Sequence, residues 1–364
     1  MYTLGIETSC DETACAVLKG SNQVLANVIS SSLNRHKPFG GVVPEIASRH
    51  CLEAIDFVFQ EALRKARLKP KQIDLIAVTQ GPGLIGSIFV GVSFAKALSF
   101  ALDIPLVGVN HIEAHLEGNF IGRKKPRAFI GLIVSGGHTS LVRYQNAHYH
   151  LLGETVDDAI GEAYDKVAKI LGLGYPGGPV IDRLAQSGNP KVFSFTKPKQ
   201  EGRFDFSFSG IKTAVLNLCE PIHNCHSRGS GNLDPRLKHS GMTGWSSTFV
   251  KDLCAGFQES VIRWIVEKAF LACDETGINT IVVGGGASAN SRLRSLLVER
   301  AQTRKTRLFV PSISHTTDNA IMIACLGYAL YRSGVRSDFC MIADPSLKIG
   351  SSSSLTGGNN GTST

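Results

Sequence analysis

The stretch VNHIEAHLEG, residues 109–118, sets two histidines four positions apart behind the apolar run IPLVGV. Residues i and i+4 of a helix project from one face, so His111 and His115 could share a metal ion. A zinc metalloprotease needs H-E-x-x-H, in which the glutamate after the first histidine activates water. Here Ile112 holds that position, and Glu113 is turned about 200° around the helix, away from the histidines. The spacing therefore indicates two metal ligands without a protease's general base.

A metal site that stays open to substrate needs a third ligand from elsewhere in the chain. The segment HTTDNAIMIA supplies Asp318, which follows hydroxyl residues and precedes a helix-like run. From the residues alone, a three-ligand metal site and a pair of histidines on a polar helix face are equally good interpretations.

Two glycine-rich turns could bind an anion. In VSGGHT, residues 134–139, Gly136 and Gly137 allow close approach of a phosphate to backbone N–H groups, and Ser135, His138 and Thr139 add side-chain donors. Taken alone, such a turn is more often a structural hairpin. GGGASAN follows an apolar strand and opens a helix, whose N-terminal dipole favours anions. Neither turn has dinucleotide-fingerprint spacing, and the chain has no Walker A sequence.

The stretch DDAIGEAYDKVAKILGLGYPGGPVIDRLA, residues 157–185, carries acids, an amphipathic helix and the turn GYPGGP. Asp165 and Asp182 could accept hydrogen bonds from ribose or substrate hydroxyls. The simpler interpretation of Asp165 and Lys166 is an exposed helical pair, worth roughly a few tenths of a kcal/mol.

The elements that must position these residues alternate between strands and helices, which indicates a layered α/β protein. Apolar patterning predicts strands at 3–9, 14–20, 73–83 and 104–110, and helices at 41–68, 85–102 and 111–120. Residues 129–144 repeat the strand, polar turn and strand of the N-terminus, and a third strand–glycine turn–helix lies at 280–300. We therefore predict a duplicated α/β domain whose two polar turns could hold a nucleotide phosphate from both sides.

Composition limits the class of protein. With 364 residues, 43% hydrophobic and 19% charged, the chain suits one or two soluble globular domains, and we expect no membrane span or leader peptide. Nine scattered cysteines do not form a disulfide framework and favour a reducing cytoplasm. The net charge of +8 gathers in RKARLKPK, GRKKPR and RKTR, which could bind polyanions or be solvated helix ends and loops.

Together and in this order, the motifs resemble the TsaD family, the tRNA threonylcarbamoyladenosine synthases formerly described as O-sialoglycoprotein endopeptidases. The matching segments cover most of residues 1–340 and are GIETSCDETA, GGVVPEIASRHC, QGPGLIGSIFVGVSFAKALS, GVNHIEAHLEG, LIVSGGHTSLV, DDAIGEAYDKVAKILGLGYPGGPVID, FDFSFSGIKTA, VVGGGASANSRLR and TDNAIMIA. An ordered set of this length is far more specific than any single motif.

The resemblance implies an actin/hexokinase-like ATPase fold, with two ribonuclease-H-like halves around a nucleotide cleft. We expect residues 1–110, completed by about 310–345, to form the first half, and residues 111–309 the second. Residues 220–247 are rich in Gly, Ser, His and Pro and longer than the family pattern, so an irregular insertion is expected there. The Ser- and Gly-rich residues 350–364 are expected to be a disordered tail.

The resemblance also implies roles for individual residues. The expected metal ligands are His111, His115 and Asp318, holding one divalent ion, with Fe²⁺ favoured and Zn²⁺ as the alternative. Glu12 and His138 are expected to assist catalysis. The expected contacts to the substrate are Val134, Ser135, Gly136, Gly137, His138, Asp165, Gly178, Asp182 and Asn290.

The implied reaction moves a threonylcarbamoyl group from threonylcarbamoyl-adenylate to N6 of adenosine 37 in tRNAs that read codons beginning with A, releasing AMP. Expected partners are the tRNA anticodon loop, a paralogous TsaB-type subunit and a small TsaE-type ATPase, in the cytoplasm and without a membrane. The alternatives are an ATP-dependent regulatory or nucleic-acid-binding module and, less favoured, a metalloendopeptidase. A sugar kinase on the same fold lacks a supporting signature.

Overall fold

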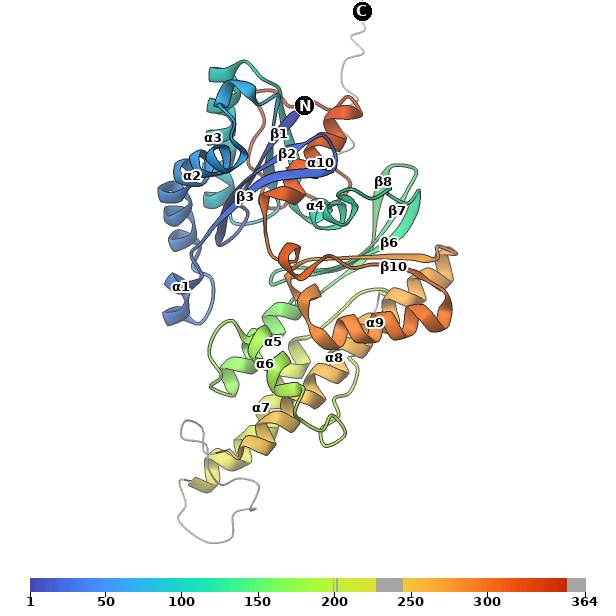
Figure 1. The fold of residues 1–364 in the computed structure, drawn as a ribbon. Helices are drawn as coiled ribbons and strands as arrows, with labels where there is room; N and C mark the ends of the chain where they lie inside the picture. The colour runs from blue at the N-terminus through green and yellow to red at the C-terminus, as the bar shows by residue number, and fades with distance from the viewer. Residues whose placement is uncertain (199, 201, 227–244, 352–364) are drawn as a thin grey trace, which may run out of the picture. The chain divides into compact units, whose positions relative to one another are not determined.

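A computed structural model describes residues 1–198, 200, 202–226 and 245–351 (Figure 1). Within it the chain forms two compact units. Unit 1 comprises residues 1–127, 144–150 and those from 311 onward, and unit 2 comprises residues 128–143 and 151–310. The metal-ligand candidates 111 and 115 therefore belong to unit 1, although the predicted boundary after residue 110 assigns them to the second half.

Unit 1 is built on a five-stranded sheet with the order β3-β2-β1-β4-β5. The first three strands pair antiparallel, and β1, β4 and β5 are parallel neighbours. The strands are β1 (Tyr2–Glu7), β2 (Glu12–Lys19), β3 (Gln23–Ser31), β4 (Leu75–Gly81) and β5 (Leu106–Asn110). Because β1, β4 and β5 are parallel, their carboxyl ends meet at one edge of the sheet, which is where polar residues follow each strand.

Helices cover both faces of this sheet, as the nearly continuous apolar sequence of its central strands requires. In β4, Ile76 and Val78 face the core beneath α2 and α3, while Leu75 and Ala77 face α10 and α4. The helices of unit 1 are α1 (Leu33–His36), α2 (Pro44–Ala66), α3 (Ile85–Leu102), α4 (His111–Glu117) and α10 (Ala320–Arg332). Among the described residues α3 is the one helix long and apolar enough to cross a membrane, by length and composition alone.

After α10 the chain returns to the unit 1 sheet. Its backbone bonds first to β5, through Ser337 N–H and Leu106 O at 2.9 Å, and then to the end of β4, through Asp344 N–H and Gln80 O at 2.9 Å. Its described part reaches the metal-candidate helix α4, where Gly350 N–H donates to the Glu113 carboxylate at 2.7 Å. The last described residues thus hold α4 against the strand ends.

Unit 2 repeats the plan. Its sheet has the order β10-β9-β6-β7-β8. The consecutive strands β6, β7 and β8 are neighbours, β9 pairs parallel with β6, and β10 pairs parallel with β9. The strands are β6 (Ala128–Val134), β7 (Thr139–Gln145), β8 (His148–Glu154), β9 (Thr280–Gly284) and β10 (Arg307–Phe309). The α/β class and the duplicated halves, both predicted from the sequence, are confirmed.

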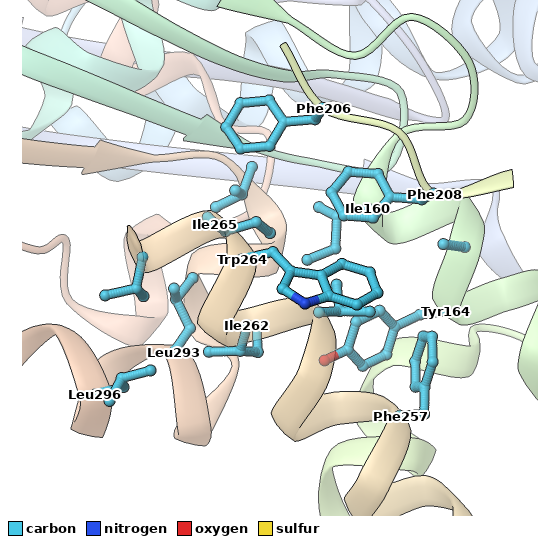
Figure 2. Close-up of a cluster of buried hydrophobic side chains, with 14 of the residues drawn as sticks. Ile160, Tyr164, Phe206, Phe208, Phe257, Ile262, Trp264, Ile265, Leu293 and Leu296 are labelled. Atoms are coloured by element: carbon cyan, nitrogen blue, oxygen red, sulfur yellow. The ribbon is translucent and has the colours of Figure 1, made fainter. Parts of the chain in front are cut away.

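The core of unit 2 forms around the long helix α8, whose buried face includes Phe257, Ile262 and Ile265 (Figure 2). Phe206 and Phe208 lie beside it with their rings stacked, 6.2 Å between centroids. The helices are α5 (Ile160–Ile170), α6 (Gly177–Ala185), α7 (Ser209–His226), α8 (Ser247–Thr276) and α9 (Ser291–Arg304).

The predicted insertion at 220–247 differs from the structure at both ends. Residues 220–226 continue helix α7, and α8 begins at Ser247. A proline such as Pro221 removes one helical N–H, which is why the sequence suggested a break there. A proline does not always end a helix, however, and α7 continues through this position. The remainder of that segment, 227–244, and nearly all of the predicted tail lie outside the described residues.

Candidate metal centre and phosphate-binding loop

The three predicted metal ligands lie together in unit 1. Helix α4 begins directly after β5, and Asn110 caps it by accepting hydrogen bonds from the N–H groups of Ile112 and Glu113. The cap fixes the first turn, so that His111 and His115, both buried, face the same side. Asp318 precedes the N-cap of α10 and completes the cluster.

The separations within the cluster suit one metal ion. His111 Nε2 and His115 Nε2 are 3.2 Å apart, and Asp318 Oδ1 is 3.6 Å from the first and 3.2 Å from the second. A tetrahedral ion with ligand bonds of about 2.1 Å separates its ligand atoms by about 3.4 Å. Two imidazole nitrogens and a carboxylate oxygen are a ligand set that iron and zinc both accept. The residues therefore fit the predicted metal, and they leave coordination positions for a substrate.

The other nitrogen of His111 is also bound. Its Nδ1 lies 2.9 Å from Glu7 Oε2 and 3.2 Å from Ser9 Oγ. Burial acts to lower the pKa of His111, but the Glu7 and Asp318 carboxylates outweigh it and raise the pKa to about 9. The two carboxylates therefore favour a positive charge at this site.

Glu12 lies at the start of β2 and accepts a hydrogen bond from Ser31 Oγ at 3.3 Å. Burial, with the nearby Asp318 and Asp11 carboxylates, raises the pKa of Glu12 to about 10. A bound cation would act in the opposite direction and favour the carboxylate. Glu12 thus borders the metal ligands in unit 1, while its role in catalysis stays a prediction.

The predicted phosphate loop connects β6 and β7 in unit 2. Ser135 N–H donates to His138 O at 2.8 Å, and His138 N–H donates to Ser135 Oγ at 3.0 Å, which closes a tight turn. Gly136 and Gly137 at its tip are exposed, with open space where a side chain would stand. Their N–H groups have no acceptor among the described residues, so they are available to an anion.

Two further glycines allow this loop to pack closely. A Cβ on Gly161 of α5 would lie 2.7 Å from Ser135 O, and one on Gly285, which has φ +93°, would lie 2.3 Å from Val134 O. Gly161 N–H instead donates to Ser135 O at 3.2 Å. The N-terminus of α5 and the end of β9 therefore pack directly against the backbone of the loop.

Asp165 lies in the middle of α5, and Gly178 is the second residue of α6. The Asp165 carboxylate accepts a hydrogen bond from Gly177 N–H at 2.7 Å, and Gly178 has open space around its Cα. Burial raises the pKa of Asp165, which the Gly177 hydrogen bond partly opposes. The structure therefore shows Asp165 as a cap for the α6 N-terminus, and its contact with a substrate stays a prediction.

Asp182 and Asn290 are joined through a residue that the sequence pattern did not single out. Gln258 donates from Nε2 to Asp182 Oδ1 at 3.0 Å and accepts at Oε1 from Asn290 Nδ2 at 2.8 Å. Asn290 also caps α9, and Asp182 accepts from the Ser291 N–H at 3.1 Å and hydroxyl at 2.7 Å. The GGGASAN segment, predicted to open a helix, first forms a 3₁₀ turn at Gly286–Ala289. The α-helix α9 begins only after this turn, at Ser291.

Glu7 and Gln258 are among the polar partners that sequence reasoning missed. Glu7 ends a buried strand inside the motif GIETSCDETA, and an acid at the carboxyl end of a parallel strand is a signal that could have found it. Gln258 is a buried residue in the middle of the 30-residue helix α8, and no local pattern distinguishes it.

Comparisons with known proteins give the family of the chain. The family described as TsaD: tRNA N6-adenosine threonylcarbamoyltransferase matches residues 23–325. The chain is 47% identical over 352 residues to the protein of that name from Dictyoglomus turgidum, covering 96% of this chain and 99% of that one. It is 46% identical over 359 residues to the one from Bacillus subtilis, covering 98% of each.

Solved structures share the fold at low identity. HypF from T. kodakarensis superposes with a TM-score of 0.56 at 16% identity, over 92% of this chain and 48% of that one. Full-length HypF in a phosphate- and nucleotide-bound form gives 0.55 at 14%, over 90% of this chain and 46% of that one. The chain thus spans about half of these HypF structures, which show the fold alone. By its full-length match to curated relatives, the chain belongs to the TsaD family of tRNA N6-adenosine threonylcarbamoyltransferases.

Proposed function

We propose that this protein transfers the threonylcarbamoyl group of threonylcarbamoyl-adenylate to N6 of adenosine 37 in tRNAs that read codons beginning with A. The observation that carries the proposal is the complete His111–His115–Asp318 cluster in a chain that matches its family over nearly its whole length. N6 attacks the carbamoyl carbon, the bond from that carbon to the phosphate oxygen breaks, and AMP leaves with the electron pair while N6 gives up a proton.

His111, His115 and Asp318 would hold one divalent metal ion, with Fe²⁺ favoured over Zn²⁺. When bound, such an ion supplies Lewis-acid polarisation of the carbamoyl group or holds the threonyl part. The chain's own residues orient the ligands: Asn110 caps α4 and Asn319 caps α10, each by accepting two backbone hydrogen bonds.

The loop Val134–His138 is proposed to hold the phosphate of the adenylate. Its support is the pair of exposed glycine N–H groups at the tip, which can donate to an oxyanion as negative charge develops on departing AMP. His138 is proposed to add a donor there. Asp165, Gly178, Asp182 and Asn290 are proposed to contact the nucleoside, and Glu12 to help with the proton that N6 loses.

The tRNA partner is supported by the basic surface. Adenosine 37 lies in the anticodon loop, so its base can be presented without melting a duplex. Arg123 and Lys124 in the GRKKPR segment are exposed and form no ion pair among the described residues, which leaves their charge free for phosphates.

A protein partner is also proposed, namely a paralogous TsaB-type subunit together with a small TsaE-type ATPase. Its support is apolar surface on α3, where Ile85, Phe89 and Phe100 are 53%, 63% and 78% exposed. Large apolar side chains gathered on one surface commonly mark a protein interface. The proposed location is the cytoplasm.

Nucleoside mass spectrometry tests the proposed reaction. Unmodified tRNA is incubated with threonine, bicarbonate, ATP, an adenylate-forming enzyme and this protein, with and without the partner proteins. Wild type should yield threonylcarbamoyladenosine, and His111→Ala should reduce the yield at least about a hundredfold, because losing one of three ligands removes the metal.

The matched control is His148→Ala. His148 is an exposed histidine at the start of β8, in the 144–150 segment that belongs to unit 1, and the variant should keep wild-type yield. No modified nucleoside from wild type with all partners present would refute the proposal. It would favour a nucleotide- or nucleic-acid-binding module without turnover.

A further inference from the structure

The buried carboxylate of Glu7 lies next to the metal-ligand cluster without belonging to it. Glu7 is the last residue of β1 and is fully buried. The parallel register pairs Ile6 with Val78, so Glu7 stands beside Thr79 of β4. Thr79 in turn pairs with Val109 of β5, two residues before His111. Three adjacent strand ends therefore bring Glu7, Thr79 and His111 to one point.

Each group around the Glu7 carboxylate is able to donate a hydrogen bond to it. Ser9 N–H donates to Oε1 at 2.5 Å, and the Thr79 hydroxyl donates to Oε2 at 2.8 Å. The same Oε2 lies 2.9 Å from His111 Nδ1. A carboxylate held by a backbone N–H and a hydroxyl is an acceptor toward the imidazole, so we assign the proton of the neutral ring to Nδ1.

This assignment decides which His111 nitrogen is free. With the proton on Nδ1, the lone pair is on Nε2, the atom that lies 3.2 Å from His115 Nε2 and 3.6 Å from Asp318 Oδ1. The alternative tautomer would direct an N–H toward the other two ligands and could not bind a metal. Among the described residues, the carboxylate that pairs with His115 is the ligand Asp318 itself, so the supporting carboxylate belongs to His111.

We propose that Glu7 is a positioning residue of the metal centre, which orients His111, fixes its tautomer and strengthens its Nε2 as a ligand, with Thr79 and Ser9 holding Glu7 in place. The proposal rests on the metal site proposed above. A hydrogen-bonded carboxylate makes the imidazole a better electron donor to the ion, and removing such a partner typically weakens metal affinity about 10–100-fold.

Metal affinity tests the proposal independently of tRNA chemistry. Purified full-length protein is stripped with a chelator, and its Kd for Zn²⁺ and Co²⁺ is measured by competition with a chromophoric chelator, together with the visible spectrum of the Co²⁺ form. Glu7→Gln keeps the shape but offers one oxygen to three donors. We expect its Kd to rise about 10–100-fold, with a shifted Co²⁺ spectrum.

The matched control is Glu117→Gln. Glu117 is a similarly buried carboxylate on α4, bound by Tyr149 and Lys125 rather than by a metal ligand. A purely structural role for Glu7 would make both variants lose thermal stability and leave both metal affinities alike. Our proposal requires the affinity to fall in Glu7→Gln and to stay near wild type in Glu117→Gln.

A second variant keeps the proposal testable if Glu7→Gln does not fold. Thr79→Val removes one donor to Glu7, and we expect a smaller rise in Kd, of about three- to tenfold. In a double variant with His111→Ala, Glu7→Gln should cause no further loss of metal affinity, because it acts through the His111 ring. Wild-type affinity in Thr79→Val, or in a folded Glu7→Gln, would overturn the inference. Failure of the wild type itself to bind metal would instead refute the metal site.

Discussion

At the scale of single residues, the candidate sites depend on polar side chains that fix one another's positions by hydrogen bonds. Gln258 is the clearest case in unit 2, because its amide presents a donor to Asp182 and an acceptor to Asn290. Neither a carboxylate nor an apolar side chain can satisfy both neighbours at once. The two residues proposed to contact the nucleoside are therefore held in place by a third, buried residue.

Gln258→Glu would place a second carboxylate 3.0 Å from Asp182 Oδ1. We expect a loss of about 1–3 kcal/mol in unfolding free energy, since a buried acceptor pair replaces a hydrogen bond. We also expect a higher KM for threonylcarbamoyl-adenylate. Denaturant unfolding and steady-state kinetics measure the two effects.

Gln186→Glu is the control for that variant, because Gln186 donates to Ser291 Oγ from an exposed position. Its stability and KM should stay close to wild type. Equal behaviour of the two glutamate variants would show that the buried amide does not organise Asp182 and Asn290.

At the scale of elements, a buried histidine ties the short helix α1 to its surroundings. His36 Nδ1 accepts a hydrogen bond from Val43 N–H at 3.2 Å, and its Nε2 lies 2.8 Å from Ser32 Oγ, which donates to Asp11 O. His36 is therefore neutral, with its proton on Nε2. Burial lowers the pKa of His36, and nearby His50 acts in the same direction against the opposing Asp11 carboxylate.

A lowered pKa makes stability depend on pH in a defined direction. The unfolded chain takes up the proton near pH 6.5 and the folded chain only at lower pH. The stabilisation is thus complete above about pH 6.5 and is lost as pH falls through the folded-state pKa. Denaturant unfolding at several pH values between about 5 and 7.5 should show this loss.

His36→Asn keeps an acceptor near Nδ1 but cannot titrate. Its unfolding free energy should therefore fall less between about pH 7.5 and pH 5 than that of wild type. Parallel pH profiles for the two proteins would exclude His36 as the titrating group.

At the scale of the whole molecule, the net charge of +8 and its gathering in short runs point to a polyanionic partner. Arg123→Gln/Lys124→Gln removes two exposed charges without breaking an ion pair among the described residues. tRNA affinity should fall, and the slope of log K against log salt should flatten by roughly 0.7–0.9 for each phosphate that is no longer neutralised. Fluorescence anisotropy with labelled tRNA at several salt concentrations measures both.

Arg49→Gln serves as the comparison, because Arg49 is already paired with Glu45 on α2. It should change the salt slope little. If both variants shift affinity equally, general charge rather than the GRKKPR segment binds tRNA.

The sequence predicts those parts of the structure that local pattern determines. The i and i+4 spacing of His111 and His115, the glycine turn at 135–138 and the repeated strand pair each carry their information within a few residues. Asp318 is about 200 residues away in the chain, and order among family motifs rather than periodicity identified it. The outer strands β3 and β8 have largely exposed or half-buried residues, and their patterns predict strands only weakly.

What the sequence could not predict is how the remaining polar groups pair. Glu7 is a partner of His111 only because β1, β4 and β5 are parallel neighbours, and Gln258 meets Asp182 only because α8 packs on α6. Such pairings arise from tertiary packing and leave no local periodicity.

The closing of unit 1 by the chain's last described residues has a consequence for synthesis on the ribosome. When residue 310 has been made, two of the three metal ligands exist, but Asp318, helix α10 and the segment that reaches Glu113 do not. One face of the unit 1 sheet has only the short helix α4 to cover it while unit 2 is translated, because α10, which also packs on that face, is made afterwards. A product truncated before Asp318 therefore has no complete metal centre, and metal can be loaded only late in translation.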